Sequence, residues 1–437
     1  MNVSSLVGHV LELIECVEGE TQPPDRTVGE FLRQKKYLGS HDRRFISDSI
    51  YGLIRHRRLS RTLIKQFIHE HPDTAILEAP HIRHFSAYIA YTVAVENKTS
   101  PPAQYWKTCF PKIDLQQFCE WIRARRSLDF LSDRIETVAT QYSFEDWMVR
   151  ALDEALGSET EQLLAALNTE APITLRVNLL KATREECKRR LATEGIETVL
   201  TSKSPAGLIA SKRFNTRALS SFSGGWFEVQ DEGSQLLSYL LNLQPGMTII
   251  DGCAGAGGKT LHMADLLHDE GQIIAFDVHT GRLKELEQRA NRAGIHCVTT
   301  RHTGDVNQED FVGKADCVLV DAPCSGTGTI RRNPWLKWNV TEPIVQHYAE
   351  TQRNILSANA RYVKPGGTLA YATCSLFRSE NEDVVRWFLS AHPNFKLIDM
   401  RERLEPFAID SSEPFCSLYP HRHNTDGFFI ALMQRLE

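Results

Sequence analysis

The chain has 437 residues, a net charge of −5, 42% hydrophobic and 24% charged residues. This length and composition fit about two or three globular domains, and they exclude a disordered chain and a strong overall basic field. No apolar run is long enough to span a membrane, and the N-terminal stretch carries Glu12, Glu15 and Glu18 without a basic leader, so neither a membrane segment nor a signal peptide is expected. The ten cysteines never form a C-x-x-C pair, which argues against metal sites and disulfides and favours a cytoplasmic location.

The N-terminal part of the chain is expected to be helical. Apolar residues recur at helical spacing in VGEFLRQKKYL (28–38) and DRRFISDSIYGLIRHRRLSRTLIKQFI (42–68). Pro101 and Pro102 predict a loop at 97–104, and a second helical stretch follows at 143–167. Small basic clusters fit either a polyanionic partner or solvated helix faces: 33–36, 55–61, 123–126, 188–190 and 331–332.

A small α/β unit is expected next. ITLRVNLL (173–180) alternates like a strand, and IETVLTS (196–202) returns to strand. Between them TREECKRRLATEG (183–195) has the signature of a capped helix that Gly195 closes.

The remainder of the chain alternates regularly between strand and helix. The expected strands are MTIID, GQIIAFDV, ADCVLVDAP and GTLAYATC, and a helical pattern follows each of them. This succession predicts a mostly parallel, doubly wound sheet, in which ligands bind beyond the carboxyl ends of the strands.

The glycine-rich stretch DGCAGAGGKT (251–260) lies at the first such strand end. Its ending resembles a phosphate-binding loop, but that pattern requires glycine at Cys253, and a dinucleotide fingerprint requires glycine at Thr260. The remaining pattern is a strand, an acidic residue, a tight turn and a helix. Such a turn lets a ligand approach the backbone and the free N–H groups at a helix start.

Three acidic residues follow successive strands at this expected edge: Asp251, Asp277 and Asp305. Asp277 is placed to bind ribose hydroxyls, although a helix cap or simple solvation would also explain an isolated acidic residue there. The series suits S-adenosylmethionine, which carries a ribose and an adenine but no phosphate.

Two cysteines also fall in polar turns after apolar strands. Cys324 lies in DAPCSGTGTIRRNPWLKW (321–338), and Cys374 lies in YATCSLFRSENED (371–383). A lone cysteine is usually a small buried apolar residue, but these two share the expected edge of the cofactor loop.

Four stretches together carry a family resemblance: DGCAGAGGKT, DAPCSGTGTIRR, YATCSLFRSENE and the terminal DGFF. Over about 146–437 the chain resembles the RNA 5-methylcytosine methyltransferases of the RsmB/Nop2/NSUN type. TLRVN (174–178) and VQDEGSQ (229–235) fit the region of that family ahead of its cofactor loop. Gly255 and Ala256 stand where alanine and proline are commoner, which removes no polar group. HDRRFISDSIYGLIRHRRL resembles the NusB-like RNA-binding domain of the bacterial 16S rRNA member, with a purely packing helical domain as the alternative.

The resemblance implies a covalent mechanism. Attack of a Cys374 thiolate at carbon 6 of cytosine activates carbon 5 to accept a methyl group. Cys324 then assists release of the product, Asp321 hydrogen-bonds the base near nitrogen 3, and Lys259 lies near the active site or is an ordinary residue of the first helical turn. The cofactor-binding residues are expected to be Asp251, Cys253, Ala254, Gly255, Ala256, Gly257, Gly258, Lys259, Asp277, Arg282, Asp305, Asp321 and Pro323.

The predicted organisation has three parts. Residues 1–140 form an all-α, NusB-like RNA-binding domain, and 141–225 form a small helical plus α/β (RRM-like) subdomain. Residues 226–437 form a Rossmann-like, S-adenosylmethionine-dependent methyltransferase domain of α/β class. The predicted partner is RNA, with rRNA favoured over tRNA, and no metal, membrane or second subunit is required.

Arg331, Arg332 and Lys337 are expected to contact RNA phosphates beside the catalytic turn. Rival interpretations are a non-catalytic RNA-binding or ribosome-assembly protein, an amino-methyltransferase and an ATPase. A non-catalytic protein would be expected to have lost one of the two cysteines or Asp321, and this chain keeps all three. An amino-methyltransferase would have [DN]-P-P-[YF] where this chain has DAPC. The spacing of the glycine loop argues against an ATPase.

Overall fold

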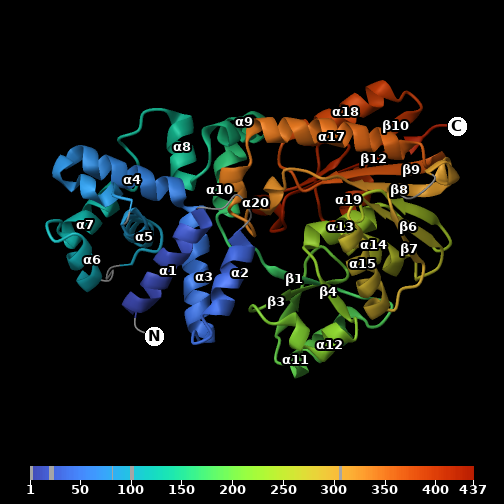
Figure 1. Cartoon of the computed structure of the whole chain (residues 1–437). Helices are drawn as coiled ribbons and strands as arrows, with labels where there is room; N and C mark the ends of the chain where they lie inside the picture. Colours follow the sequence, from blue (N-terminus) through green and yellow to red (C-terminus); the bar gives the residue numbers. More distant parts are fainter. Residues whose placement is uncertain (1–2, 19–23, 81, 99–102, 305–307) are drawn as a thin grey trace. The chain divides into compact units, whose positions relative to one another are not determined.

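The computed structural model describes residues 3–18, 24–80, 82–98, 103–304 and 308–437 (Figure 1). The chain folds into two compact units: Met1–Asn168 with Arg332–Val340, and Thr169–Arg331 with Thr341–Glu437. We call them the helical unit and the α/β unit. The predicted three-part division at 140/141 and 225/226 stays a prediction.

The helical unit consists of helices around an aromatic core. Phe67 and Phe118 meet edge to face with ring centroids 4.9 Å apart, and Trp106 stacks on Phe118 at 5.0 Å. Its α-helices are α1 (Val3–Glu18), α2 (Pro24–Gln34), α3 (Ser40–Arg55), α4 (Arg57–Glu70), α5 (Arg83–Ala94), α6 (Ala103–Cys109), α7 (Leu115–Arg125), α8 (Arg134–Tyr142), α9 (Asp146–Leu156), α10 (Thr160–Leu167) and α16 (Leu336–Asn339), with the 3₁₀ helices η1 (Pro72–Glu78) and η2 (Gly157–Glu159).

Two stretches that read as continuous helical patterns are interrupted. Residues 42–68 break at His56, whose φ and ψ of −113° and 24° separate α3 from α4. Residues 143–167 break at Gly157, whose φ of +54° is a conformation that glycine tolerates and other residues avoid. Half of the loop expected at 97–104, residues 99–102, lies outside the described residues, and α6 begins at Ala103.

The α/β unit begins with a small antiparallel sheet of strand order β2-β3-β1-β4. As predicted, α11 is capped at Thr183, whose side chain accepts from the Glu186 N–H while the Glu186 carboxylate accepts from the Thr183 N–H. The elements are β1 (Ile173–Val177), α11 (Arg184–Thr193), β2 (Thr198–Leu200), β3 (Gly207–Ala210), η3 (Thr216–Ala218), α12 (Ser220–Ser223), β4 (Phe227–Val229) and α13 (Glu232–Leu240).

The large sheet has the order β10-β12-β9-β8-β5-β6-β7, and β11 pairs with β12. The five strands from β9 to β7 are parallel, and β10, β11 and β12 add antiparallel pairings, which confirms the predicted mostly parallel sheet. The strands are β5 (Thr248–Asp251), β6 (Gln272–Asp277), β7 (Val298–His302), β8 (Ala315–Asp321), β9 (Val363–Thr373), β10 (Phe395–Ile398), β11 (Cys416–Leu418) and β12 (Phe428–Arg435).

Helices cover both faces of this sheet because neighbouring strand residues point to opposite sides. Ile249 and Leu319 belong to one core with α13, α14 and α15, whereas Ile250 and Val320 belong to the other core with α17 and α18 (Figure 1). The helices of this part are α14 (Gly258–Leu266), α15 (Thr280–Ala293), α17 (Glu342–Ala360), α18 (Glu382–Ala391), α19 (Arg401–Leu404) and α20 (Pro420–His423), with η4 (Gln308–Phe311), η5 (Thr327–Thr329), η6 (Arg378–Glu380) and η7 (Glu405–Phe407).

The strand order reverses between β5 and β8. The chain leaves β5 toward β6 on one side and later places β8 on the other side, so the crevice beyond these strand ends is the expected ligand position. Asp251, Asp277 and Asp321 end β5, β6 and β8, and Cys374 directly follows β9. The topology therefore brings the predicted site residues to one edge.

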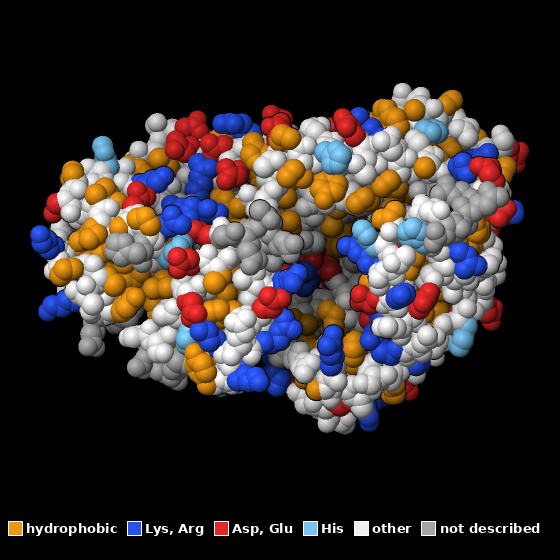
Figure 2. Space-filling view, in the orientation of Figure 1, with side chains coloured by type: hydrophobic (Ala, Val, Ile, Leu, Met, Phe, Trp, Pro, Cys, Tyr) orange, Lys and Arg blue, Asp and Glu red, His pale blue; other side chains and the backbone are white. Residues whose placement is uncertain are grey.

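Charged side chains form small groups on the face of the protein that Figure 2 shows. On the face shown in Figure 2, Lys and Arg side chains lie among Asp and Glu side chains without forming a single basic field, in line with the net charge of −5. Within the described part of the chain, no helix has the length and apolar character needed to cross a membrane.

Candidate active site

The glycine loop joins β5 to α14. Gly257 is the residue before the helix and has a φ of +84°, and a Cβ atom there would lie 1.7 Å from Cδ1 of Leu286. A side chain is therefore excluded at Gly257 by both backbone conformation and packing. A Cβ at Gly255 or Gly258 would meet nothing within 4 Å, so open space lies over these two residues.

Asp251 stands beneath this loop. It is 1% exposed, and its carboxylate accepts hydrogen bonds from Thr260 Oγ1 at 2.7 Å and from the Cys253 N–H at 3.3 Å. Burial disfavours the charged carboxylate and raises its pKa to about 6. Burial likewise raises the pKa of the Cys253 thiol, so this cysteine is an uncharged packing residue.

Two arginines that the sequence did not single out hold the loop from outside. Arg176 on β1 donates to the Gly258 carbonyl at 2.7 Å, and Arg289 on α15 donates to the Ala256 carbonyl at 2.6 Å. Arg289 also pairs with Glu228 at 3.1 Å. Arg176 lies within the quoted stretch TLRVN, but nothing in the pattern reveals its partner, and Arg289 is indistinguishable from a solvated helix residue.

The next acidic residue, Asp277, is engaged with the same loop. Its carboxylate accepts from the Gly255 N–H at 2.8 Å and from the His279 N–H at 2.7 Å. Arg282 is exposed in the first turn of α15, and Pro323 is exposed directly after β8. Asp305 lies outside the described residues. The ligand roles of Asp277, Arg282, Pro323 and Asp305 remain predictions.

The two predicted catalytic cysteines are brought together. Cys324 and Cys374 come from separate turns, and their Sγ atoms are 3.4 Å apart. The contact with the Cys374 sulfur, reinforced by burial, holds the pKa of Cys324 well above its ordinary value. Cys324 therefore retains its proton at neutral pH.

A buried glutamate fixes both cysteine turns. The Glu380 carboxylate accepts from the Ser325 N–H at 2.8 Å, from Ser325 Oγ and Ser375 Oγ at 2.5 Å each, and from Gln352 Nε2 at 3.0 Å. Each serine directly follows one of the cysteines, so this carboxylate couples the two turns. Glu380 was missed because ENED (380–383) reads as the solvated acidic start of a helix.

The terminal DGFF segment locks the same turns through backbone contacts. The Gly328 N–H donates to the Cys374 carbonyl at 2.8 Å, and the Gly427 N–H donates to the Gly328 carbonyl at 2.9 Å. A Cβ at Gly328 would lie 2.2 Å from the Gly427 carbonyl oxygen. This close crossing explains why a segment more than fifty residues after Cys374 in sequence, about 426–429, belongs to the site.

Lys259 and Asp321 form an ion pair at the edge of the site, with Nζ and Oδ2 2.5 Å apart. Burial alone would lower the pKa of Lys259, but the Asp321 carboxylate more than offsets this and raises it above its ordinary value. Lys259 is therefore charged, and its Nζ also lies 5.5 Å from the centre of the Phe428 ring. The pair places a cation beside the carboxylate that is predicted to meet the base.

Two of the three residues predicted to contact RNA phosphates are buried instead. Arg331 is 5% exposed and donates to the Glu170 carbonyl at 2.9 Å and to Asn424 Oδ1 at 3.2 Å. The interpretation of Arg331 as a phosphate contact is therefore wrong, because its guanidinium holds backbone and amide groups inside the α/β unit. Arg332 is exposed, and its role as a phosphate contact stays a prediction.

The interpretation of Lys337 as a phosphate contact is also wrong. Lys337 is 0% exposed, and its Nζ donates to the carbonyls of Arg55 and Tyr142 at 3.0 Å each and to Asn168 Oδ1 at 2.5 Å. Burial moves the pKa of this amine well below its usual range. Lys337 is a structural residue of the helical unit, and a phosphate has no access to it.

The described chain contains no group of three His, Cys, Asp or Glu side chains arranged to hold a metal ion. All ten cysteines are unpaired by disulfides in the described structure.

Comparison with known proteins places these features in one family. Residues 238–434 match the family model "16S rRNA methyltransferase RsmB/F", and residues 144–217 match the ferredoxin-like domain of RsmF/B-like methyltransferases. The chain is 33% identical over 427 residues to the probable ribosomal RNA small subunit methyltransferase B of Synechocystis sp., covering 92% of this chain and 93% of that one. It is 35% identical over 326 residues to the Bacillus subtilis protein of the same description, covering 71% and 70%.

Among solved structures, the crystal structure of PH0851 is similar with a TM-score of 0.76 and 30% identity. The similarity covers 98% of this chain and 97% of that chain.

Proposed function

The chain belongs to the RsmB/F family of 16S rRNA methyltransferases, and from this premise we propose that it methylates carbon 5 of a cytidine in RNA, with 16S rRNA as the substrate. The observation that carries the proposal is the pair of sulfurs 3.4 Å apart, beside the ion pair of Lys259 and Asp321. A methyltransferase that acts on an exocyclic amine or a hydroxyl has no need of two facing thiols.

The glycine loop and its surroundings fit S-adenosylmethionine, which supplies the methyl group. Open space lies over Gly255 and Gly258, where a ligand can approach the backbone closely. The start of α14 offers N–H groups, and Asp277 and Asp321 stand at the ends of β6 and β8, the two strands that flank β5. We propose that these residues bind the cofactor with Asp251, Cys253, Ala254, Ala256, Gly257, Lys259, Arg282, Asp305 and Pro323.

Cys374 is the proposed nucleophile. Its thiolate forms a bond to carbon 6 of the cytosine, which breaks the aromaticity of the ring and makes carbon 5 nucleophilic toward the methyl group. Asp321, held by Lys259, hydrogen-bonds the base near nitrogen 3 and stabilises this intermediate. A target base within a helix must first be turned out of the stack.

Cys324 acts in the second half of the reaction. Its raised pKa makes it a poor first nucleophile and a strong proton acceptor once it is deprotonated. The Cys324 thiol first releases its own proton to solvent, and the resulting thiolate then takes the proton from carbon 5. The electron pair of that C–H bond restores the double bond between carbons 5 and 6, and the bond between Cys374 and carbon 6 breaks. The products are 5-methylcytosine, S-adenosylhomocysteine, the Cys324 thiol and the free Cys374 thiolate.

The division of roles between the cysteines gives a direct test. Cys374→Ala is expected to abolish methyl transfer while binding of S-adenosylmethionine, measured by calorimetry, is kept. Cys324→Ala is expected to accumulate a covalent protein–RNA adduct, visible as a slowly migrating band on a denaturing gel. Cys16→Ala is a matched control at an exposed cysteine and should change neither measurement.

An active Cys374→Ala variant, or a Cys324→Ala variant that is inactive without forming an adduct, contradicts this assignment. Bisulfite sequencing of total RNA with and without the gene tests the substrate. A 5-methylcytidine lost from tRNA and not from rRNA would support the runner-up substrate, and no loss anywhere would support a binding protein that has kept the fold. We also keep the predictions of a monomer and a cytoplasmic location.

A further inference from the structure

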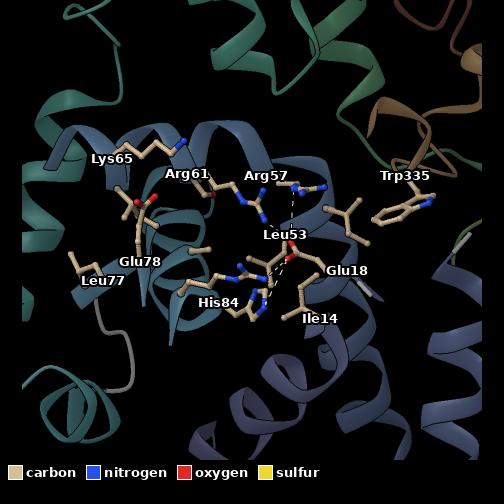
Figure 3. Close-up of a pocket in the computed structure, with 15 residues that line it drawn as sticks. Ile14, Glu18, Leu53, Arg57, Arg61, Lys65, Leu77, Glu78, His84 and Trp335 are labelled. Carbon is tan, nitrogen blue, oxygen red and sulfur yellow. Dashed lines mark hydrogen bonds and ion pairs between the residues drawn. The ribbon is translucent and has the colours of Figure 1, made fainter. Parts of the chain in front are cut away.

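The helical unit contains a cavity of about 370 Å³ that none of the proposed reaction steps uses. Its apolar wall includes Ile14, Leu53, Leu77 and Trp335, which come from α1, α3, η1 and the 332–340 segment (Figure 3). The volume is that of a site for a small organic group rather than for an ion.

Three arginines crowd around one carboxylate at this cavity. Arg61 donates to Glu18 at 2.7 Å, and Arg57 and Arg83 have nitrogens 3.8 and 3.6 Å from the Glu18 oxygens. Figure 3 shows Arg57 and Arg61 on α4, one turn apart, with Glu18 beside them. A single carboxylate thus faces three guanidinium groups, and the local charge is positive.

The other ionisable residues that line the cavity do not cancel this excess of positive charge. Lys65 adds a further cation, Glu78 adds one carboxylate, and burial keeps the pKa of His84 below its usual range, so this histidine is neutral. The described lining therefore carries four cations against two anions. Burial, and after it the charge of the neighbouring Arg61, lower the pKa of Arg57.

The combination of an apolar wall and a cationic opening selects the ligand class. Sulfate-like anions need no apolar wall, and apolar ligands need no arginines, whereas a nucleotide has a flat apolar base and a charged phosphate. The side chains of Arg57, Arg61 and Arg83 are 31, 40 and 51% exposed, so the phosphate end opens to solvent. A polymer could therefore enter and leave while one base is held inside.

We infer that this cavity binds an unpaired nucleotide of the substrate RNA, with its phosphate at Arg57, Arg61 and Arg83 and its base against the apolar wall that Trp335 closes. The inference rests on the proposed function for its assumption that the ligand is RNA. In the free protein Glu18 occupies the position nearest to the arginines, so the phosphate competes with this carboxylate.

That competition gives the inference a signature that a purely structural role of these residues would not produce. The double variant Arg61→Ala/Arg83→Ala removes phosphate partners and is expected to weaken binding of the full chain to unmodified small-subunit rRNA by about tenfold or more. The slope of log K against log salt should fall by about 0.7 for each phosphate of a single strand that no longer has an arginine partner. Glu18→Gln removes the competing charge and is expected to tighten the same binding.

The matched control is Arg26→Ala/Arg44→Ala, which removes the same charge from two arginines of the same unit that do not line the cavity. Each of them pairs with a carboxylate four residues away, and their side chains are 73 and 74% exposed. This control should leave the affinity and the salt slope close to those of the wild type. Equal effects of both double variants, or a Glu18→Gln variant that binds RNA no more tightly than the wild type, overturn the inference.

Two further measurements separate the alternatives. Tight binding of cytidine monophosphate alone, with RNA affinity unchanged by Arg61→Ala/Arg83→Ala, would assign the cavity to a free nucleotide and overturn the RNA inference. Methyl incorporation into RNA by the wild type is scored separately. Its absence would refute the proposed function, whereas normal incorporation without the predicted binding pattern would refute only this site.

Discussion

At the scale of single residues, the distinct behaviour of the two cysteines depends on groups that are not themselves reactive. Glu380 is 0% exposed and binds both serines that follow the cysteines. Hydrogen bonds to a buried carboxylate are stronger than neutral ones, and an unpaired buried carboxylate is costly. We therefore expect Glu380 to hold the two sulfurs 3.4 Å apart without contacting the substrate.

Glu380→Gln tests this positioning role. A glutamine keeps the size but has one acceptor oxygen in place of two. Both serine hydroxyls donate to Oε2, and the Ser325 N–H and Gln352 Nε2 both donate to Oε1, so one of these two pairs of donors loses its acceptor. We expect kcat for methyl transfer to fall by about tenfold or more, as for the loss of one charge-assisted hydrogen bond, while the Kd for S-adenosylmethionine stays the same. Asp383→Asn, at an exposed residue of the same acidic stretch, is the control and should not change kcat.

Asp251 links the site to the pH dependence of stability. Its pKa is about 6 in the folded protein, against 3.8 as the ordinary value. Because the folded state holds this proton more tightly than the unfolded state, the contribution of Asp251 to stability is fully present below about pH 4. It is lost as pH rises through about 6.

Asp251→Asn should therefore stabilise the protein in a pH-dependent way. The difference in unfolding free energy between variant and wild type is expected to grow between about pH 4 and pH 6, and to level off at up to about 3 kcal/mol, since one pKa unit corresponds to about 1.4 kcal/mol. Urea denaturation at a series of pH values measures it. Asp399→Asn is a useful contrast, because Arg401 lowers the pKa of Asp399 to about 2 and the trend with pH has the opposite sign. If the difference in unfolding free energy between Asp251→Asn and the wild type does not change with pH, then the pKa of Asp251 is not raised in the folded protein.

At the scale of elements, the glycine loop is positioned by the strand and helix packed around it. Arg176 on β1 holds the Gly258 carbonyl, and Arg289 on α15 holds the Ala256 carbonyl. The two guanidiniums bracket Gly257, whose positive φ gives the loop its turn. The small antiparallel sheet thereby helps to hold the loop that is proposed to bind the cofactor, although it supplies none of the proposed ligand-binding residues.

Arg289→Ala is expected to raise the Kd for S-adenosylmethionine by about tenfold, which corresponds to the loss of a charge-assisted hydrogen bond of roughly 1.4 kcal/mol. At saturating cofactor, kcat should change little, because Arg289 acts on the loop and not on the base. Arg292→Ala is the matched control: Arg292 pairs with the same Glu228, and its guanidinium donates to that carboxylate rather than to a loop carbonyl. Calorimetric titration of S-adenosylmethionine measures the Kd of both variants. An equal loss of affinity in both would mean that the ion pair with Glu228, and not the hydrogen bond to the loop carbonyl, supports binding.

The elements could be predicted where local pattern and tertiary structure agree. Alternation in the strands, the capping box at Thr183 and Glu186, and the glycine loop are local features, and the structure has them where the sequence placed them. The break at His56 could not be predicted, because the apolar spacing of 42–68 continues through it. The partners of Glu380 and Arg289 lie in other elements of the fold, and no local pattern reports such contacts.

At the scale of the whole molecule, the most misleading region is the stretch after Cys324. It reads as one basic loop beside the catalytic turn, yet the chain divides at 331/332, and Arg332–Val340 belongs to the helical unit. Lys337 and Trp335 are buried there by groups from distant parts of the chain, including Asn168 and Tyr142 for the lysine. Tertiary contacts bury Lys337, and the sequence does not reveal them. In the sequence Lys337 is simply a lysine near the predicted catalytic turn, which is why the sequence predicts a phosphate contact.

The contribution of this inserted segment can be measured by dissection. A fragment of residues 1–168 lacks Trp335 and the Lys337 amine, which donates to the Arg55 and Tyr142 carbonyls. We expect it to be less stable than the same fragment joined through a flexible glycine–serine linker to residues 332–340, by about 3–5 kcal/mol for the buried tryptophan alone. Thermal unfolding followed by circular dichroism compares the two.

The joined fragment carrying Trp335→Ser and Lys337→Ser is the control, and it should return to the stability of 1–168. If 1–168 unfolds at the same temperature as the joined fragment, then these contacts stabilise little and the helical unit folds without the segment. If instead the difference appears and the control removes it, the stretch that carries Cys324, the proposed catalytic cysteine, also completes the core of the helical unit. One stretch of sequence would then serve the chemistry of one unit and the stability of the other.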